Sequence, residues 1–356
     1  MKDIYKDIPC EEISDPSALV KEPLVSACMI TYNHAPYIAQ AIEGVLQQQT
    51  NFPFELVIGE DWSTDGTREI VFDYQKKHPD VIRIVTSDKN VGAEKNSLRT
   101  EKACRGKYLA YCEGDDYWHH PQKLQKQIEF LENHPDYGLV HSEVNMCNVE
   151  SGRKIENLNR FDKVTNHTFD NNNGDLFFEI LVQIYKIRTC SVCVRKKLLD
   201  HVVESDPVVF QSDRFMMGDI TRWLELSRLT KFKYIDEPLA TYNELSESLS
   251  HSKDIRKAVK FKLSRFDRTL YYAEKYGYTD KLPQSWWDHY TRPLLSYSYD
   301  NQDVEIAVML KEKRKHFPFI QRLLYWGSIN PVIHLLLWPL VYSKRFISKL
   351  VTVLRV

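Results

Sequence analysis

The sequence predicts an α/β protein with a mostly parallel central sheet. Short apolar runs alternate with segments of helical period through the first 120 residues, and polar residues follow each run. Strands that alternate with helices in this way form parallel sheets with right-handed crossovers. With 43% hydrophobic and 27% charged residues, the 356-residue chain has the composition of a globular protein of one or two domains.

Three strand–helix units are predicted before residue 107. The turn at 60–67 carries the Ser, Thr, Asp and Gly residues that favour chain reversal, and Gly106 is placed to terminate the third helix. The predicted strands are 24–30, 54–59 and 81–85, and the helices that follow them are 37–49, 68–77 and 96–104.

The next strand runs directly into acidic residues. The segment 108–118 reads Tyr-Leu-Ala-Tyr-Cys-Glu-Gly-Asp-Asp-Tyr-Trp, so Glu113, Asp115 and Asp116 fall at a strand end. Ligands of parallel sheets collect beyond the carboxyl ends of the strands. Carboxylate oxygens suit Mg²⁺ or Mn²⁺ bridging to a diphosphate. The alternative is a solvated acidic turn.

An ordered set of motifs extends this pattern. It consists of Thr31-Tyr-Asn33, the turn 61–67, Asn90-x-Gly92, Gly106-Lys-Tyr108, Glu113-x-Asp115-Asp116 with Trp118, Gly218-Asp219 with Trp223, and 234–240. Over roughly residues 24–251 the chain resembles the family-two inverting glycosyltransferases. That resemblance implies a GT-A fold, a nucleotide-diphosphate sugar donor and a divalent cation. The donor is expected to be a UDP-sugar.

The resemblance also implies roles for particular residues. Asp61 would accept a hydrogen bond from a uracil, and Glu113, which replaces the usual Asp, could reach ribose or water instead of the metal. Lys95 is either near the nucleotide or a solvated lysine, and His251 is either a metal ligand or a surface residue. Nucleotide-binding residues are expected to be Thr31, Tyr32, Asn33, Asp61, Lys95, Glu113 and Asp115, and metal ligands Asp115, Asp116 and His251.

The catalytic base is predicted to be Asp219. Displacing a nucleotide diphosphate with an alcohol requires a base to take the hydroxyl proton. Asp219 precedes a predicted helix at 221–229, where backbone N–H groups would hold its carboxylate, and the family places its base there. The alternatives are that Asp219 is only a helix N-cap, with Asp213 as the reserve base.

The chain beyond the motifs suggests a membrane surface. From Lys311 onward, nine basic residues and one acidic residue give a net charge of +8, which leaves −9 for the rest of the chain. Apolar and basic residues alternate there in the pattern of a helix lying on an anionic membrane, with packing on the protein as the alternative. We expect an arm at 1–22, a nucleotide-sugar half at 23–145, an acceptor and catalytic half at 146–255, a helical extension at 256–327 and a basic amphipathic tail at 328–356.

Together these features predict an inverting, metal-dependent glycosyltransferase that uses a glycan or lipid-linked acceptor in cell-surface polysaccharide synthesis. Seven scattered cysteines and the lack of a secretory signal at the start predict a cytoplasmic location, peripheral to the membrane. No nucleic-acid motif is visible. A sugar-nucleotide binder without turnover and a sugar nucleotidyltransferase remain as alternatives.

Overall fold

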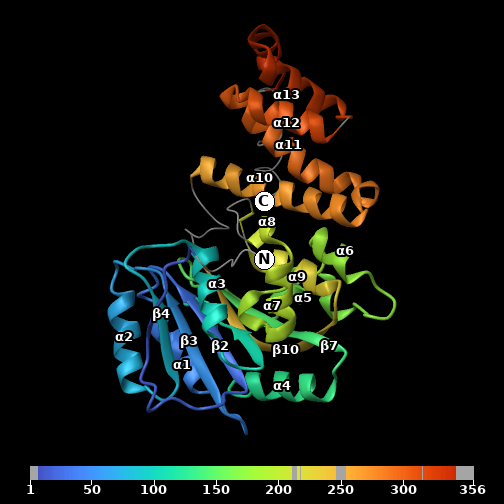
Figure 1. Ribbon diagram of the computed structural model, residues 1–356. Coiled ribbons are helices and arrows are strands. Elements are labelled where there is room, and N and C mark those ends of the chain that lie inside the picture. The colour runs from blue at the N-terminus through green and yellow to red at the C-terminus, as the bar shows by residue number, and fades with distance from the viewer. Residues whose placement is uncertain (1–6, 211–214, 217, 246–253, 315, 342–356) are drawn as a thin grey trace. The chain divides into compact units, whose positions relative to one another are not determined.

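The computed structural model describes residues 7–210, 215–216, 218–245, 254–314 and 316–341 (Figure 1). The chain divides into two compact units, Met1–Ser248 and Leu249–Val356. The first contains every strand found in the described ranges, and the second is helical there. The division falls a few residues before the predicted boundary at 255.

A ten-stranded sheet forms the centre of the first unit, as far as the chain is described. Its order is β1-β4-β3-β2-β5-β9-β7-β10-β6, with β8 paired to β7. Strand β2 pairs in parallel with β3 and with β5, and β7 pairs in parallel with β10. The strands are β1 (Glu11–Ile13), β2 (Val25–Thr31), β3 (Phe54–Glu60), β4 (Ile82–Thr86), β5 (Tyr108–Tyr111), β6 (Tyr117–Trp118), β7 (Tyr137–Asn148), β8 (Lys154–Ile155), β9 (Cys193–Arg195) and β10 (Lys231–Glu244).

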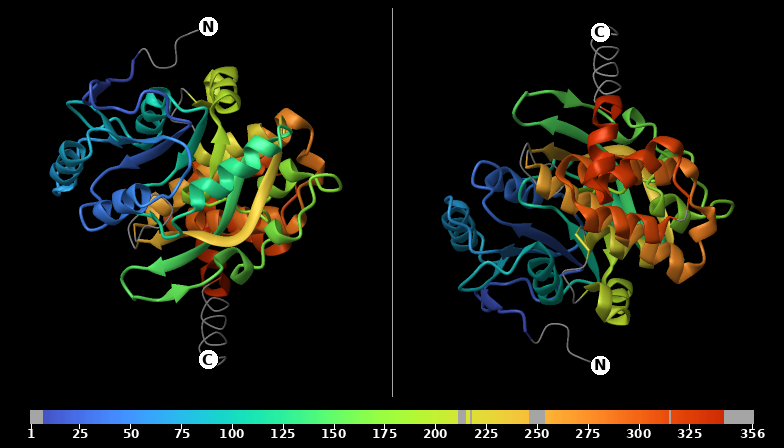
Figure 2. Two further views of the ribbon diagram at one scale, coloured as in Figure 1. Left: turned by 90° about the horizontal axis from the view of Figure 1, so that it is seen from below. Right: turned by 90° about the horizontal axis from the view of Figure 1, so that it is seen from above.

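Helices cover both faces of this sheet (Figures 1 and 2). Helices α1 and α2 lie on one face, and α3 packs on β2 and β3 from the other, as right-handed crossovers require. Helix α9 packs against α6 and α7. The helices of this unit are α1 (Ile38–Leu46), α2 (Thr67–Lys77), α3 (Ala93–Ala103), α4 (Lys123–Asn133), α5 (Leu158–Phe161), α6 (Leu176–Leu181), α7 (Lys196–Ser205), α8 (Pro207–Phe210) and α9 (Gly218–Ser227), with short 3₁₀ turns η1 (Thr165–His167) and η2 (Thr189–Ser191).

The core follows from the apolar runs in the sequence. Every residue of β4 and β5 is buried, as is typical of strands covered on both faces. Helix α1 turns Ile38, Ile42 and Val45 inward at helical spacing, and all three are fully buried. This buried framework fixes the strand ends from which the candidate site is built.

One local prediction was wrong. Helix α3 ends at Ala103, and Gly106 does not terminate it, because the C-cap is Cys104, which is extended. A Cβ at Gly106 would lie 2.6 Å from the Ser26 backbone nitrogen and 2.8 Å from the Val25 carbonyl carbon. Glycine is therefore required for close approach to β2.

In the second unit, the described helices pack against one another around aromatic side chains. Phe266 stacks on Trp286 with ring centroids 5.5 Å apart, and Tyr290 lies 5.0 Å from Trp286. All three are buried, so these aromatic side chains form part of the core of the second unit. Its helices are α10 (Ile255–Tyr276), the 3₁₀ turn η3 (Thr279–Lys281), α11 (Gln284–Asn301), α12 (Val304–Lys313), α13 (Phe319–Ile329) and a helical segment at 331–341.

Within the described residues, every helix is too short or too polar to cross a bilayer. All seven cysteines are free thiols, so no disulfide joins them.

Candidate active site

The segment from Glu113 to Asp116, here called the acidic loop, lies against the loop that follows β2. Because β2 and β5 are parallel neighbours, their carboxyl ends meet at one edge of the sheet. The Gly114 amide donates a hydrogen bond to the Ile30 carbonyl at 2.9 Å. A Cβ at Gly114 would lie 2.6 Å from Thr31 Oγ1 and 3.1 Å from His34 Nδ1. The glycine between Glu113 and Asp115 thus lets the two loops touch.

Asp115 faces this junction. Its Oδ2 lies 3.9 Å from His34 Nε2, and its side chain is 23% exposed. Asn243 of β10 holds the Asp115 backbone, because its side-chain amide donates to the Asp115 carbonyl at 2.6 Å. The carboxylate is therefore fixed at its base and partly open to solvent.

Glu113 is a buried acid of this loop with a strongly raised pKa. Burial, and then repulsion from Asp115, raise the pKa of Glu113 to about 8, with Asp219 contributing in the same direction. The Thr189 hydroxyl lies beside Glu113 and acts to lower its pKa. Its Oε2 is buried and has no hydrogen-bond partner among the described residues. An acid in this position is short of a compensating positive charge.

Asp116 has a different environment. It is 5% exposed, and its Oδ1 accepts a hydrogen bond from the Asn243 backbone amide at 2.8 Å. Burial and the neighbouring acids raise its pKa well above the usual range. Because this carboxylate already anchors β10 and is shielded from solvent, the geometry favours Asp115 over Asp116 as a metal ligand. The role of Asp116 stays a prediction.

Asp219 joins the acids from a distant part of the sequence. It lies in the first turn of α9, and its Oδ2 accepts a hydrogen bond from Thr189 Oγ1 at 2.9 Å. Since Thr189 also contacts Glu113, one hydroxyl bridges the predicted base and the acidic loop. Among the described residues, no backbone N–H group of α9 donates a hydrogen bond to the Asp219 carboxylate, so the contacts expected from the helix start are not formed and the Thr189 hydroxyl holds the side chain instead. The role of Asp219 as the base stays a prediction.

Thr31, Tyr32 and Asn33 form the other side of the junction. Thr31 Oγ1 is buried without a hydrogen-bond partner in the described structure, and Tyr32 is 45% exposed. Asn33 has a left-handed φ of 56°, and its Oδ1 accepts from the Thr64 amide at 2.9 Å. Asn33 thus ties this loop to the turn after β3, while Tyr32 remains available to a ligand.

The turn after β3 is built as the sequence indicates. Asp65 accepts hydrogen bonds from the Thr67 amide and hydroxyl and from the Ala35 amide, so it organises the turn. Trp62 adopts a left-handed φ of 62° and is 41% exposed. The Arg68 guanidinium lies 4.9 Å from the Trp62 ring centroid. The bulky residue is accommodated by stacking on a cation.

Asp61 and Lys95, both predicted to bind the nucleotide, differ in their exposure to solvent. Asp61 accepts hydrogen bonds from the backbone amides of Val91 and Gly92, at 2.8 and 3.0 Å, and is 1% exposed. In this position Asp61 holds the 90–92 turn, so uracil recognition by Asp61 stays a prediction. Lys95 is exposed in the first turn of α3. His251 and Asp213 lie outside the described residues.

Two residues of the cluster were missed from the sequence. His34 follows the Thr-Tyr-Asn motif directly, and that adjacency was the available signal. Thr189 had no signal, because only the pairing of β9 with β5 and β7 brings η2 to the acidic loop.

The donor set fits a divalent cation that is shared with a substrate. Among the described residues, no group of three or more His, Cys, Asp and Glu is arranged to hold a metal ion. Mg²⁺, and Mn²⁺ in similar sites, can be bound through one or two carboxylates with substrate phosphates and water completing the shell. The partly exposed Asp115, and the buried Glu113 that lacks a partner, meet that smaller requirement.

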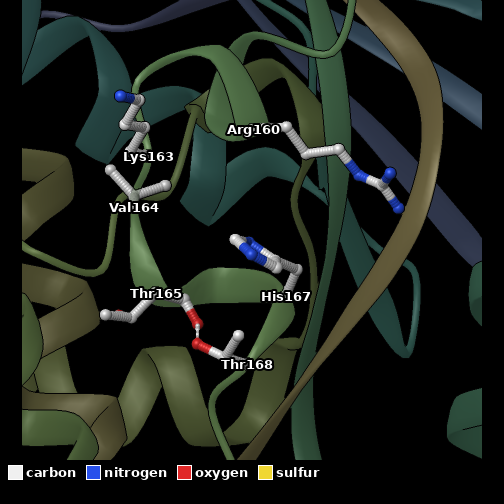
Figure 3. Close-up of a pocket in the computed structure, with 6 residues that line it drawn as sticks. All are labelled: Arg160, Lys163, Val164, Thr165, His167 and Thr168. Atoms are coloured by element: carbon white, nitrogen blue, oxygen red, sulfur yellow. Dashed lines mark hydrogen bonds between the residues drawn. The ribbon is translucent and has the colours of Figure 1, made fainter.

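A separate cavity of about 490 Å³ lies around η1 (Figure 3). Its polar lining is basic and hydroxylic, but Arg160 is held in an ion pair with Asp236. It contains none of the predicted site residues and belongs to the stretch expected to face the acceptor. The lining residues are Arg160, Lys163, Val164, Thr165, His167 and Thr168.

Comparison with known proteins identifies the domain that carries this site. Residues 26–188 match the family described as glycosyl transferase family 2. These residues form a family 2 glycosyltransferase domain. The predicted family and the GT-A fold class are thereby confirmed.

Relatives and a solved structure agree with this family. Rv1520 of Mycobacterium tuberculosis is 42% identical over 130 residues, which are 36% of this chain and 37% of that protein. TuaG of Bacillus subtilis, provisionally named a teichuronic acid biosynthesis glycosyltransferase, is 36% identical over 110 residues, covering 31% of this chain and 42% of TuaG. The aligned parts span less than half of either relative.

In structure, the chain is similar to residues 1–349 of Staphylococcus aureus TarS, crystallised with UDP-GlcNAc. The TM-score is 0.51 at 15% identity, with 85% of this chain and 86% of the TarS chain covered. At that identity the likeness concerns the fold.

Proposed function

We propose that the protein transfers a sugar from a nucleotide-diphosphate donor to a hydroxyl group of a glycan or lipid-linked acceptor, with inversion at the anomeric carbon. The observation that carries this proposal is the hydroxyl of Thr189, which joins Asp219 to the buried acid Glu113 within a family 2 domain. The proposed base and the proposed cation-binding acids are thus neighbours at one edge of the sheet.

The residues divide the chemistry between them. Asp219 takes the proton of the acceptor hydroxyl as its oxygen bonds to the anomeric carbon, while the bond to the diphosphate breaks and its electron pair leaves with the diphosphate. Thr189 holds the Asp219 carboxylate in one orientation. Asp115 would hold Mn²⁺ or Mg²⁺, which when bound neutralises the charge on the leaving diphosphate.

The donor side is proposed to take a UDP-sugar. Tyr32 is exposed beside Thr31, whose hydroxyl has no partner in the described residues, so one supplies an aromatic surface and the other a free polar group. The name of TuaG and the UDP-GlcNAc bound to TarS are consistent with a UDP-sugar and a polysaccharide product. For the acceptor, the 146–187 stretch with its η1 cavity is the proposed side of approach.

Asp219→Asn tests the reaction. Amide replacement keeps the shape but removes the base, so turnover should fall by about 10²–10⁴-fold. UDP affinity should stay within about threefold, because the base does not hold the nucleotide. Asp73→Asn, at an exposed position of α2, is the matched control and should retain full turnover.

The assay follows sugar transfer from UDP-sugars with Mn²⁺, and UDP binding by calorimetry. Loss of turnover with preserved binding supports the transferase. Binding without turnover in the wild-type protein across a panel of nucleotide sugars and acceptors would favour the sugar-nucleotide binder instead.

A membrane surface is the proposed location of the second unit. Its α13 and the 331–341 helical segment expose large apolar side chains by 45 to 73%. Exposed apolar surface near cations suits an anionic bilayer, and Lys313 and Arg322 are exposed in the same unit. Arg314 does not contribute, because it is buried against Asp288. The exposed apolar residues are Phe319, Ile320, Trp326, Val332, Leu335, Leu336, Trp338 and Leu340.

Vesicle sedimentation tests this location. The double substitution Leu335→Glu, Leu336→Glu should lower binding to vesicles containing anionic lipid by at least tenfold, because it places charge in the apolar surface. Ile184→Glu, at an exposed apolar position of the first unit, is the control and should bind as the wild type does. Equal binding by all three proteins would remove the membrane proposal.

A further inference from the structure

We infer that Arg222 is a positioning residue that sets where the Asp219 carboxylate lies. This inference rests on the proposed function, since it concerns the base of that reaction. Arg222 is three residues after Asp219 on α9 and is 2% exposed. Residues three apart lie on the same side of a helix, so a contact made by Arg222 constrains the turn that carries Asp219.

Arg222 links α9 to α3 through two carboxylates. Its Nη1 lies 3.0 Å from Glu94 Oε1, and its Nε lies 3.1 Å from Glu101 Oε1. Glu94 and Glu101 stand at the two ends of α3, which follows the 90–92 turn. A single guanidinium therefore fixes both the distance between the helices and the rotation of α9 about its axis.

The same cluster reaches the strand that leads to the acidic loop. Tyr111, the last residue of β5, donates its hydroxyl hydrogen to Glu101 Oε1 at 2.9 Å. Trp223, the neighbour of Arg222, meets the edge of the Tyr111 ring at a centroid distance of 5.7 Å. Since Glu113 is two residues beyond Tyr111, the contacts of Arg222 and Trp223 connect the base helix to the acids it must face.

Gly218 shows how tightly the helix start is placed. A Cβ at this position would lie 1.8 Å from Glu94 Oε2 and 2.6 Å from Arg222 Nη1. The Glu94 carboxylate thus rests against the backbone immediately before Asp219. A larger residue at position 218 would require the Glu94 or Arg222 side chain to shift.

The buried ion pairs of Arg222 with Glu94 and Glu101 are better explained by positioning of α9 than by stabilisation of the fold alone. Buried ion pairs are often no more stabilising than apolar residues of similar volume, because desolvating the charges is costly. Burial raises the pKa of Glu94, which is consistent with that cost. Ion pairs from one buried guanidinium to two carboxylates still limit where the helices can lie, and an error of about 1 Å in the position of a reacting group can lower a rate by about 100-fold.

The test compares three proteins. Arg222→Lys keeps one positive charge but loses the planar fork, and the triple substitution Arg222→Met, Glu94→Gln, Glu101→Gln removes all three charges so that no unpaired charge is buried. We expect kcat to fall about 100-fold in the triple variant and about 10-fold in Arg222→Lys. KM for the donor and UDP affinity should change less than threefold in both.

A second measurement does not depend on turnover. Hydrogen exchange of the α9 backbone amides should accelerate at least tenfold in the triple variant, while the amides of α4 exchange as in the wild type. Wild-type kcat or unchanged α9 exchange in a folded triple variant would overturn the inference. Retained turnover in Asp219→Asn would instead refute the proposed function, so the two failures are distinguishable.

Discussion

Replacing Glu113 by Gln should change how stability depends on pH. Burial among acids raises the pKa of Glu113 from its ordinary 4.5 to about 8, so the folded protein holds this proton more tightly than the unfolded chain does. Stability from this group is fully present below pH 4.5 and is lost as pH rises through 8. Glutamine has the shape of the protonated acid and does not ionise, so this loss should disappear.

The size of the effect follows from the two pKa values. The difference between 4.5 and about 8 corresponds to about 5 kcal/mol once Glu113 is fully ionised in both states. Relaxation and water entry around buried charges reduce such effects, so we expect about 2 kcal/mol between pH 5 and pH 9. Relative to the wild type, Glu113→Gln should therefore gain about that much stability at pH 9 and almost nothing at pH 5.

Urea unfolding at pH 5, 7 and 9, without added metal or nucleotide, measures this difference. Glu129→Gln, at an exposed position of α4, is the control and should run parallel to the wild type at each pH. If the Glu113→Gln curve also runs parallel to the wild type, Glu113 is not protonated in the folded protein. Burial and the neighbouring acids would then not raise the pKa of this carboxyl group.

Three further predictions concern the cation, the sheet and the second unit. Chelation with EDTA should weaken UDP binding, and Asp115→Asn should do so by a similar factor, with no further loss when the two are combined; undiminished binding in EDTA would exclude the metal role. Gly106→Ala should destabilise the first unit by about 1–3 kcal/mol in chemical denaturation, because its Cβ would meet backbone atoms of β2 that cannot move aside; an unchanged midpoint would contradict the close approach. Arg314→Met should destabilise the second unit by about 1–3 kcal/mol, because Arg314 Nη1 donates to Asp288, Thr291 and Gln321 in a buried network. A lowered melting temperature for the first unit alone would contradict this prediction.

Much of the nucleotide half could be predicted from local patterns. The predicted strand 54–59 became β3 at Phe54–Glu60, and the predicted helix 68–77 became α2 at Thr67–Lys77. These elements bury apolar residues at the spacing of their own secondary structure, so a window of about ten residues contains the signal. The family could be recognised for a similar reason, because its motifs are short and ordered along the chain.

Other parts could not be predicted locally. The edge strand β1 exists only because Glu11–Ile13 pairs with β4, and the Glu12 carboxylate forms an ion pair with Arg83 of that strand at 2.7 Å. The charge count for the C-terminal part also overestimated its exposed positive charge, since Arg314 is buried. A charge count cannot distinguish a solvated side chain from one that is paired inside a fold.

The sequence by itself determined that acids stand at the end of a buried strand and that Asp219 stands near the start of a helix, because strand and helix periods and their end signals are local. The tertiary structure decided which of those acids meet. Parallel pairing of β2 and β5 places His34 beside Asp115, and η2 delivers Thr189 to both Glu113 and Asp219. It also decided the burial that raises the pKa of Glu113, because desolvation depends on what the whole chain packs around a carboxylate.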